Sequence, residues 1–437
     1  MKSYLEQAFG RRDVTSSRMQ AAIREWMALY FGDPVPGETP EDRLAVLIVN
    51  KLCRAVFSEY ESRLREPASR LGPALDALNA VRAQAMQYAL VGGECLLKPV
   101  PTAAGFDFLP IRRDCYAPLD RDAHGTLQAV GTMQQLGRHL LLERRTAGPD
   151  GLTIETRLFE RAGEILGREV PLDTLPQTAQ LQPRLLLPGV QGVGLAVLRT
   201  PLLNCVDGGP DAVAVFAPAV GLIHSLGRLE HQLHREFENG ASRVFASEDL
   251  MRQDTFGRRV LADDLFVGLP DDPANVGLTV YSPALRVDQF MTRKQDLLRS
   301  CESLLGFKRG ILSEVEAAER TATEITSSEG DYNLTVQDFQ TMWGDGLRSA
   351  LTLCDTLGRV YGKADGAPFD PSGDLVVDWG DGVLFDRTRT WNEYREMTQA
   401  GLLRPELALA WYFDLPHETE ADLAAIRRRY LPAGSQT

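Results

Sequence analysis

The stretch from residue 211 to residue 239 constrains the fold more than any other part of this sequence. Its apolar residues alternate steps of four and three positions, and Gly240 follows where such a helix would end. These residues are Val215, Ala219, Leu222, Leu226, Leu229, Leu233 and Phe237. The spacing predicts a helix with a narrow apolar seam of the kind that packed helices use. Two interpretations remain open: the seam covers the core of its own domain, or it packs against a neighbouring subunit.

Chain length and composition set the broad class. With 437 residues the chain exceeds the size at which one hydrophobic core usually stops growing, so we expect two or three structural units. Hydrophobic residues at 44% and charged residues at 24% exclude a disordered or collagen-like chain. The formal net charge of -13 excludes tight duplex binding by bulk electrostatics, because the phosphate backbone is itself anionic.

Export and membrane signals are not predicted. The first residues, MKSYLEQAFGRR, contain no apolar run of signal-peptide length. The longest uncharged apolar stretch, from Ala212 to Ile223, is too short for a bilayer and contains Pro218. The six cysteines form no CxxC pair, so we expect reduced core thiols in a cytoplasmic protein. They are Cys53, Cys95, Cys115, Cys205, Cys301 and Cys354.

The first half of the chain changes its hydrophobic period near residue 93. Helical spacing predicts helices over 17–31, 40–66 and 73–90. Short apolar runs, separated by glycine, proline and aspartate, then predict strands from 94 to about 200. Within this region, 174–194 has no clear period and is expected to be a long connection.

The second half is predicted to be mainly helical. Short strands are expected over 243–287, followed by a helix over 288–305. Ser313 and Glu316 have the spacing of a capping box, so a third helix is expected from there to about Tyr361. Its glycines predict a bend or a break; they are Gly330, Gly344 and Gly346. A strand is expected over 374–386 and three helices over 388–400, 404–413 and 417–430.

Motifs of catalysis are absent from the sequence: it has no phosphate-binding loop, no nucleophile elbow and no zinc-binding HExxH pair. His224, His231 and His234 lie on one side of the predicted 211–239 helix and are the one arrangement that suggests a metal site. One helix rarely supplies four ligands, so histidines on a solvated face are the favoured alternative. No cofactor and no catalytic residue is predicted.

Three short segments carry a resemblance to a known family. Arg320-Thr321-Ala322-Thr323-Glu324-Ile325 opens the long helix, His234 to Phe245 spans a helix-to-strand junction, and Asp378-Trp379-Gly380-Asp381 with Asp386 forms a late strand. In this order of elements the chain resembles the portal proteins of tailed double-stranded-DNA bacteriophages. It is most similar to a siphophage subgroup with a [KR]TATE[VI] motif. The amino-acid sequence of the segment 201–218 differs from the one that is usual at this place in the family.

This resemblance implies an α+β portal architecture with a wing, a two-helix stem, a clip, a long bent helix and a helical crown. Twelve identical subunits usually form the ring in this family. The implied segments are 1–210 for the wing, 211–242 for the first stem helix, 243–287 for the clip, 288–305 for the second stem helix, 306–319 for the tunnel loop, 320–362 for the long bent helix and 363–437 for the C-terminal strand and crown helices.

The function implied by the resemblance is structural and not enzymatic. Such a ring sits at one vertex of the capsid in the virion, after assembly in the host cytoplasm, and serves genome packaging and ejection. Its partners would be other copies of itself, double-stranded DNA in the channel, the terminase large subunit, a head-completion or adaptor protein, and the major capsid and scaffolding proteins. No membrane partner is implied.

Two sets of residues are the resulting site candidates. Channel candidates in and after the tunnel loop are Phe307, Lys308, Arg309, Glu314, Glu316 and Arg320. Subunit-interface candidates on the first stem helix are Leu222, Leu226, Leu229 and Leu233. Two alternatives to the portal remain: another phage head-completion scaffold, and a metallohydrolase that uses the three histidines.

Overall fold

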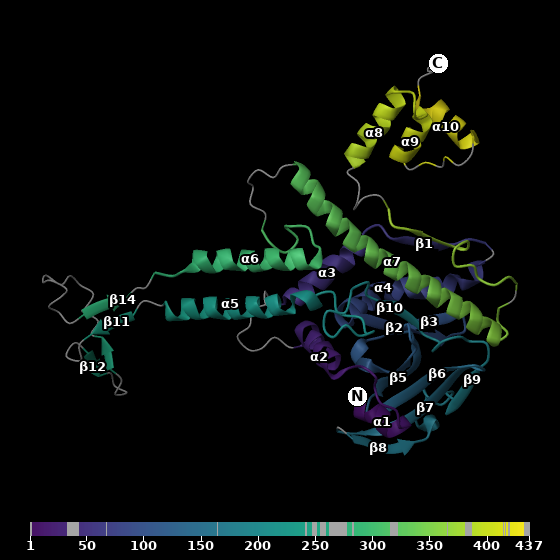
Figure 1. Cartoon of the computed structure of the whole chain (residues 1–437), viewed down its shortest axis with the longest axis horizontal. Coiled ribbons are helices and arrows are strands. Elements are labelled where there is room, and N and C mark those ends of the chain that lie inside the picture. Colours follow the sequence, from purple (N-terminus) through teal and green to yellow (C-terminus); the bar gives the residue numbers. More distant parts are fainter. Residues whose placement is uncertain are drawn as a thin grey trace.

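A computed structural model of the chain has an α/β body, a pair of helices that project from it, and a group of C-terminal helices (Figure 1). The structure describes residues 2–32, 43–66, 68–163, 165–240, 243–246, 251–253, 259–261, 278–281, 284–314, 322–364, 366–380, 387–413, 415, 417 and 420–431. Within them the fold is mixed α+β, as the sequence predicted.

Four helices make up the N-terminal part: α1 (Lys2–Phe9), α2 (Ser17–Phe31), α3 (Leu44–Val56) and α4 (Gly72–Gly92). The Ser16 hydroxyl caps α2 by accepting a bond from the Met19 amide at 3.1 Å. Gly93, with φ of 80°, ends α4 in the left-handed conformation that favours glycine. Helix α1 was not predicted.

The prediction of a helix over 40–66 is wrong in its second half. Helix α3 ends at Val56, and β1 (Glu61–Leu64) follows it. Strand β1 pairs with β15 (Leu375–Asp378), in antiparallel register from Glu61 opposite Asp378 to Leu64 opposite Leu375. This partner lies at the other end of the chain, so local periodicity carried no sign of it.

The β-rich region is confirmed and contains two sheets. A three-stranded sheet has the order β10-β2-β3, formed by β2 (Glu94–Pro101), β3 (Phe106–Ile111) and β10 (Ala196–Arg199). A six-stranded antiparallel sheet runs β4-β5-β6-β7-β8, and β9 pairs with β7. Its strands are β4 (Tyr116–Arg121), β5 (Leu127–Leu136), β6 (His139–Gly148), β7 (Gly151–Ala162), β8 (Ile165–Val170) and β9 (Arg184–Leu187). Strand β9 lies in the segment expected to be irregular.

The helix expected from residue 211 begins only at residue 220, as α5 (Val220–Asn239). The Val215 amide donates to the Leu90 carbonyl at 2.8 Å, and the Thr200 hydroxyl donates to the Val213 carbonyl at 2.8 Å. These bonds hold the buried segment 211–216 against α4 and β10 without helical structure. Pro218 lies in a short 3-10 turn, and α5 starts directly after it. The spacing of apolar residues that predicted the helix therefore extends back into a segment that is buried but not helical.

The projecting pair is completed by α6 (Val287–Leu305), and α7 (Ala322–Val360) crosses the body (Figure 1). Helix α7 is continuous over 39 residues, so it does not break at its glycines, where the sequence predicted either a bend or a break. A Cβ atom at Gly346 would collide with Leu198 of β10, so this glycine permits close helix-to-strand packing. At the predicted start, Ser313 and Glu314 are not helical, residues 315–321 lie outside the described residues, and α7 is described from Ala322.

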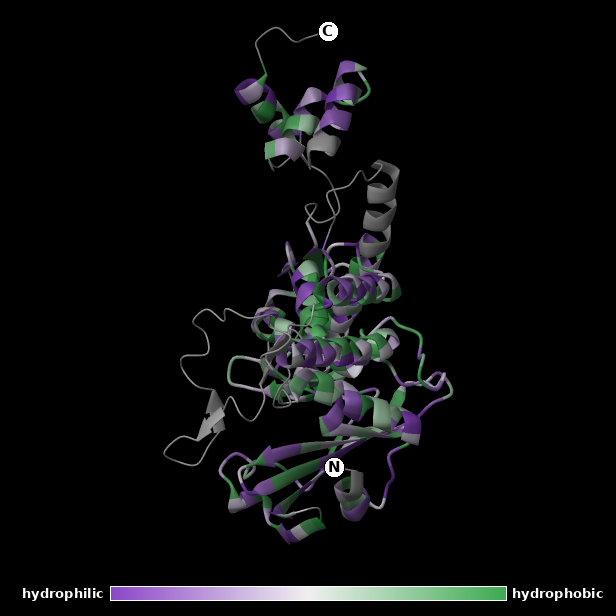
Figure 2. Ribbon diagram, turned by 90° about the vertical axis from the view of Figure 1, so that its left-hand side faces the viewer, coloured by the Kyte–Doolittle hydropathy of each residue, from purple (hydrophilic) through white to green (hydrophobic). Residues whose placement is uncertain are grey.

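Three short helices end the chain: α8 (Arg387–Gln399), α9 (Pro405–Phe413) and α10 (Glu420–Tyr430), all close to their predicted bounds. The main apolar core lies between α2, α3, α4, the base of α5, the end of α6, and α7. Figure 2 shows hydrophobic residues concentrated on the helices at the centre of the molecule. The projection α5–α6 is therefore rooted in the largest core of the protein.

Candidate functional site: the paired helices and the loop after them

Helices α5 and α6 run antiparallel, side by side, away from the body (Figure 1). At the body end they share buried apolar residues, including Ile223 and Leu226 of α5 and Leu298, Cys301 and Leu305 of α6. These side chains belong to the same apolar cluster as α3, α4 and α7. Burial of this size fixes the direction of the pair relative to the body.

Ion pairs join the two helices farther from the body. Lys294 Nζ lies 2.6 Å from Glu230 Oε1, and the Glu230 side chain is 9% exposed. Near the tip, Arg286 donates to both carboxylate oxygens of Glu236, from Nε at 3.0 Å and from a terminal nitrogen at 2.8 Å. A forked pair of this kind specifies geometry as well as charge. The two helices are therefore held in register along most of their length.

A small β unit follows the tip of the pair. Strand β11 (Arg243–Ala246) pairs with β14 (Leu278–Tyr281), so that the chain leaving α5 returns beside itself before it enters α6. Strands β12 (Met251–Gln253) and β13 (Arg259–Leu261) form a second antiparallel pair. Residues 247–250, 254–258 and 262–277 of the expected clip lie outside the described residues.

The subunit-interface candidates on α5 mainly cover their own chain. Leu226 is 3% exposed and belongs to the main core, and Leu222 and Leu229 pack against that core. Leu233 is half-buried. The expectation that this seam faces a neighbouring subunit is wrong for Leu226, because α6 and the body already cover it.

Other residues of the pair do present apolar surface outward. Phe237 of α5 is 49% exposed, and Met291 and Leu304 of α6 are also exposed. The sequence analysis included Phe237 in the seam but did not distinguish it from the buried leucines. These side chains are the apolar surface of the pair that its own chain leaves uncovered.

The loop after α6 begins with a left-handed glycine, Gly306, at φ of 65°. Phe307 follows and is 6% exposed within the main core. A side chain buried there does not line a channel, so the expectation for Phe307 is wrong. Lys308 is half-buried and Arg309 is exposed. The two cations of the loop therefore follow directly after a phenylalanine that is buried in the main core.

Three further channel candidates follow this loop. Glu314 is exposed, and its backbone amide donates to Gln295 Oε1 of α6 at 2.9 Å. Glu316 and Arg320 lie outside the described residues. The motif that begins at Arg320 runs into the described chain at Ala322, where α7 starts.

A buried carboxylate that the sequence pattern did not predict lies where this loop joins α6. Glu302, on the last turns of α6, is fully buried, and its carboxylate accepts bonds from residues 310, 312 and 313. The available signal was a glutamate within the apolar side of the predicted helix, next to Cys301. A charged residue at an apolar position needs buried partners, and the sequence did not reveal them.

A second buried charge network lies where the body meets the segment that leads to α5. Asp211 accepts from Arg113 at 3.3 Å and from Arg121 at 3.0 Å. Glu94 accepts from the Tyr116 hydroxyl at 2.5 Å, and burial raises the pKa of that hydroxyl. Since both carboxylates are almost fully buried, the network fixes the start of this segment to β2 and β4.

The histidines do not form a metal site. His224 Nε2 lies 2.7 Å from Glu25 Oε1 of α2, and His234 Nε2 lies 3.3 Å from Glu238. All three histidines are exposed on α5. Among the residues that the structure describes, no group of three potential ligands is close enough to hold a metal ion.

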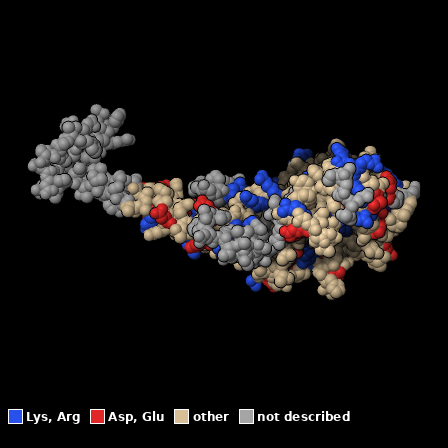
Figure 3. All heavy atoms as spheres, turned by 90° about the horizontal axis from the view of Figure 1, so that it is seen from above, with Lys and Arg blue, Asp and Glu red and all other residues tan. Residues whose placement is uncertain are grey.

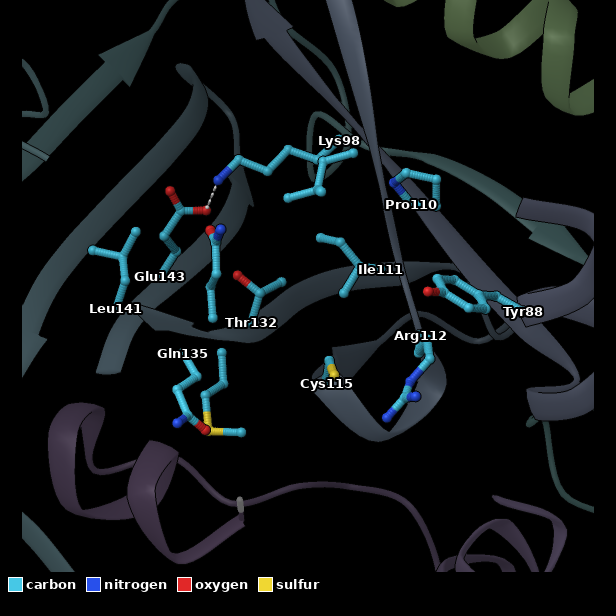
Figure 4. A pocket seen from close by; sticks show the side chains of 13 residues that line it. Tyr88, Lys98, Pro110, Ile111, Arg112, Cys115, Thr132, Gln135, Leu141 and Glu143 are labelled. Carbon is cyan, nitrogen blue, oxygen red and sulfur yellow. Dashed lines mark hydrogen bonds and ion pairs between the residues drawn. The ribbon is translucent and has the colours of Figure 1, made fainter. Parts of the chain in front are cut away.

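One pocket of the body lies between β3, β5 and β6 (Figure 4) and has a volume of about 300 Å³. Ile111 and Leu141 form part of its apolar lining. Its charged groups are paired in place: Lys98 Nζ lies 2.6 Å from Glu143, and Arg112 donates twice to Asp114. The pocket therefore offers few unsatisfied polar groups to a ligand.

The thiols are not activated. Burial raises the pKa of Cys115, in this pocket, to about 11, and the nearby Asp114 carboxylate acts in the same direction. Burial likewise raises the pKa of Cys301 to about 11 and that of Cys354 to about 12. A protonated thiol is a poor nucleophile, so none of the three fits a nucleophilic role. Cys205 is exposed, contrary to the expectation of core thiols.

Charges of both signs are interspersed over the described surface in the view of Figure 3. No described helix is both long enough and apolar enough to cross a bilayer. Searches against models of known protein families and against curated proteins found no match. The geometry of the molecule itself is therefore the basis for a functional proposal.

Proposed function

We propose that this protein is the portal, or head-tail connector, of a tailed bacteriophage. One observation carries the proposal: an antiparallel helix pair projects from an α+β body, bears a small β unit at its tip, and is followed along the chain by a 39-residue helix. This succession corresponds to the wing, stem, clip, tunnel loop and long helix of the family that the sequence resembles. The C-terminal helices α8 to α10 would form the crown.

The exposed surface of the helix pair supports assembly with other copies. Each helix is covered by its neighbour on one side, and Phe237, Met291 and Leu304 remain exposed on the others. Exposed apolar side chains on a projecting element favour burial against another protein surface. In a closed ring every subunit would present one side of its pair to the next, which is a head-to-tail contact.

The charge of the chain agrees with a conduit for DNA. A channel that held phosphates tightly would slow the passage of the genome, because each phosphate contact releases counterions and adds affinity. The net charge of -13 and the interspersed surface charges favour weak contact. Lys308 and Arg309 on the loop after α6 are the proposed cations that face the passing duplex, and they would act at long range.

Location and partners follow from this role. The ring would assemble in the host cytoplasm and then occupy one vertex of the capsid in the virion. Its partners would be the terminase large subunit, an adaptor or head-completion protein, the major capsid and scaffolding proteins, and double-stranded DNA. The tip of the helix pair, with β11 and β14, is the proposed docking surface for the terminase and adaptor.

Particle architecture tests the proposal. Negative-stain microscopy and native mass spectrometry of purified protein should reveal closed rings of about twelve subunits with a central hole. Phe237→Asp should weaken ring formation while the helical content of the monomer stays unchanged, because this side chain is half-exposed in the subunit. His231→Asp, at an exposed position of the same helix, is the matched control for an added charge.

Two outcomes would contradict the proposal. Particles without a continuous central hole would favour another head-completion scaffold. A monomer at all concentrations, with stoichiometric zinc bound, would revive the metallohydrolase alternative despite the geometry of the three histidines.

A further inference from the structure

The carboxylate of Glu302 is surrounded by donors from the loop that follows its own helix. Oε1 accepts from the backbone amides of Gly310 at 3.0 Å, Leu312 at 2.7 Å and Ser313 at 2.9 Å. Oε2 accepts from the Ser313 hydroxyl at 2.7 Å. The residue is 0% exposed. A single side chain thus satisfies four donors of a segment that has no regular secondary structure.

These bonds account for the conformation of the loop. Of the three amides, that of Ser313 is buried, that of Leu312 belongs to a half-buried residue and that of Gly310 to an exposed one. Leaving a buried amide without an acceptor costs about 1–3 kcal/mol. The Glu302 carboxylate supplies the acceptors for all three amides, and its described partners are neutral donors. Charged acceptors make stronger hydrogen bonds than neutral ones. The loop is therefore shaped around this one carboxylate.

Further bonds attach the same loop to α6 and α7. The Glu314 amide donates to Gln295 Oε1 at 2.9 Å. Gln295 lies in the middle of α6, just before its buried residues begin at Leu297. On the other side, the Thr335 hydroxyl of α7 donates to the Gly306 carbonyl at 3.3 Å. Phe307 is buried in the core between these attachments. Residues 306–314 are thereby connected to both helices at fixed points.

We propose that Glu302 is a positioning residue that makes residues 306–314 one rigid body with the end of α6. Lys308 and Arg309 then have a fixed place relative to the helix pair, and a displacement of α6 displaces both cations. The rigidity itself does not depend on the channel. Only its consequence for DNA rests on the proposed function, so the two are tested separately.

Hydrogen exchange of the full-length protein tests the rigid loop. In Glu302→Ala the amides of Gly310, Leu312 and Ser313 should exchange at least about tenfold faster, while the amides of α5 and α7 keep their protection. Trypsin should cut after Lys308 and Arg309 faster in this variant. Glu314→Ala is the matched control, because only the backbone amide of Glu314 takes part in the bonds described here.

Two milder variants keep the test decisive if Glu302→Ala does not fold. In Glu302→Gln the amide oxygen can still accept from the three backbone amides, so exchange should rise less than in the alanine variant. Ser313→Ala removes one of the four bonds and should raise exchange by only a few-fold. Unchanged exchange at the three amides in both variants would overturn the proposal.

The consequence for DNA has its own measurement. If the chain forms the proposed channel, rings of Glu302→Ala should assemble normally but retain packaged DNA less well than rings of the unsubstituted protein. Faster loop exchange with normal DNA retention would preserve the rigid loop and remove its role in the channel. Normal loop exchange would reject the inference whatever happens to DNA.

Discussion

The body and the projecting helix pair differ in how they handle charge. In the body, Asp211 and two arginines are sequestered from solvent and bond to one another. At the tip of the pair, Glu236 bonds to Arg286 through the same chemistry, but the Arg286 side chain is 63% exposed. Buried ions must be paired for the protein to fold, whereas exposed pairs contribute little. The charges compared here are thus buried and paired within the body, whereas those at the tip of the projecting pair remain largely exposed to solvent.

The comparison is tested most strongly by one substitution in each half of α5. Leu226→Asp places a carboxylate in the main core and should lower the free energy of unfolding by about 4 kcal/mol or more. Phe237→Asp should leave monomer stability nearly unchanged. Urea denaturation followed by circular dichroism measures both. Equal destabilisation would mean that the distal half of α5 is as well covered as its base.

The next largest effect is expected for the buried network. Asp211→Ala leaves Arg113 and Arg121 without a shared counter-charge and should cost about 3 kcal/mol. Glu236→Ala removes the forked pair with Arg286 at the exposed tip and should not shift the denaturation midpoint measurably. If both changes cost the same, exposure does not distinguish the two regions.

A pH titration sharpens the comparison within the body. Burial alone would raise the pKa of Asp355, but bonds from Arg70 and Arg359 and from the Phe369 amide outweigh it and lower that pKa. The stabilisation is therefore complete above the ordinary carboxyl pKa of about 4 and is lost as pH falls through the lower folded value. Asp355→Asn should lower the melting temperature by about 3 °C at pH 7.

The same variant predicts the acid limit. The melting temperatures of Asp355→Asn and the parent should converge as pH falls below about 4, because the parent carboxyl then becomes protonated. A constant difference down to pH 2 would show that the substitution acts through packing and not through charge.

The smallest effect concerns the thiols. Cys205 is exposed, whereas Cys301 and Cys354 are buried with raised pKa values, so alkylation at pH 8 should modify Cys205 first. Mass spectrometry after brief treatment with iodoacetamide measures the order. Early labelling of Cys354 would indicate opening of α7 from the body.

The sequence predicted most helices and the β-rich region because their periodicity is local. It started the helix from 211 too early, because the segment 211–216 is as apolar and buried as a core helix although it is not helical. It ended the helix from 40 too late, because the residues after Val56 pair through β1 with a strand that is distant in the sequence. Glu302 was missed for a different reason. Its donors come from residues 310–313, and their convergence depends on the left-handed turn at Gly306.

The glycines of α7 illustrate the limit of propensity. Gly346 weakens a helix taken alone, but its missing side chain leaves room for Leu198 of β10. Tertiary packing thus stabilises the continuous helix at a glycine where local propensity predicted a bend or a break. The apolar spacing likewise predicted α5 itself. That α6 covers the apolar side of α5 could not be predicted, because the contact joins two segments that are distant in the sequence.

The pairing of β1 with β15 has a consequence for biosynthesis. About 300 residues separate these two strands, so a ribosome that adds 5–20 residues per second needs roughly 15–60 s between them. Throughout that interval β1 has no partner, although the helices around it have already emerged. The sheet of β1 and β15 therefore closes only after residue 378 has been synthesised. Translation itself delays the finished subunit, and a truncated product would be left with an open edge for quality control to recognise.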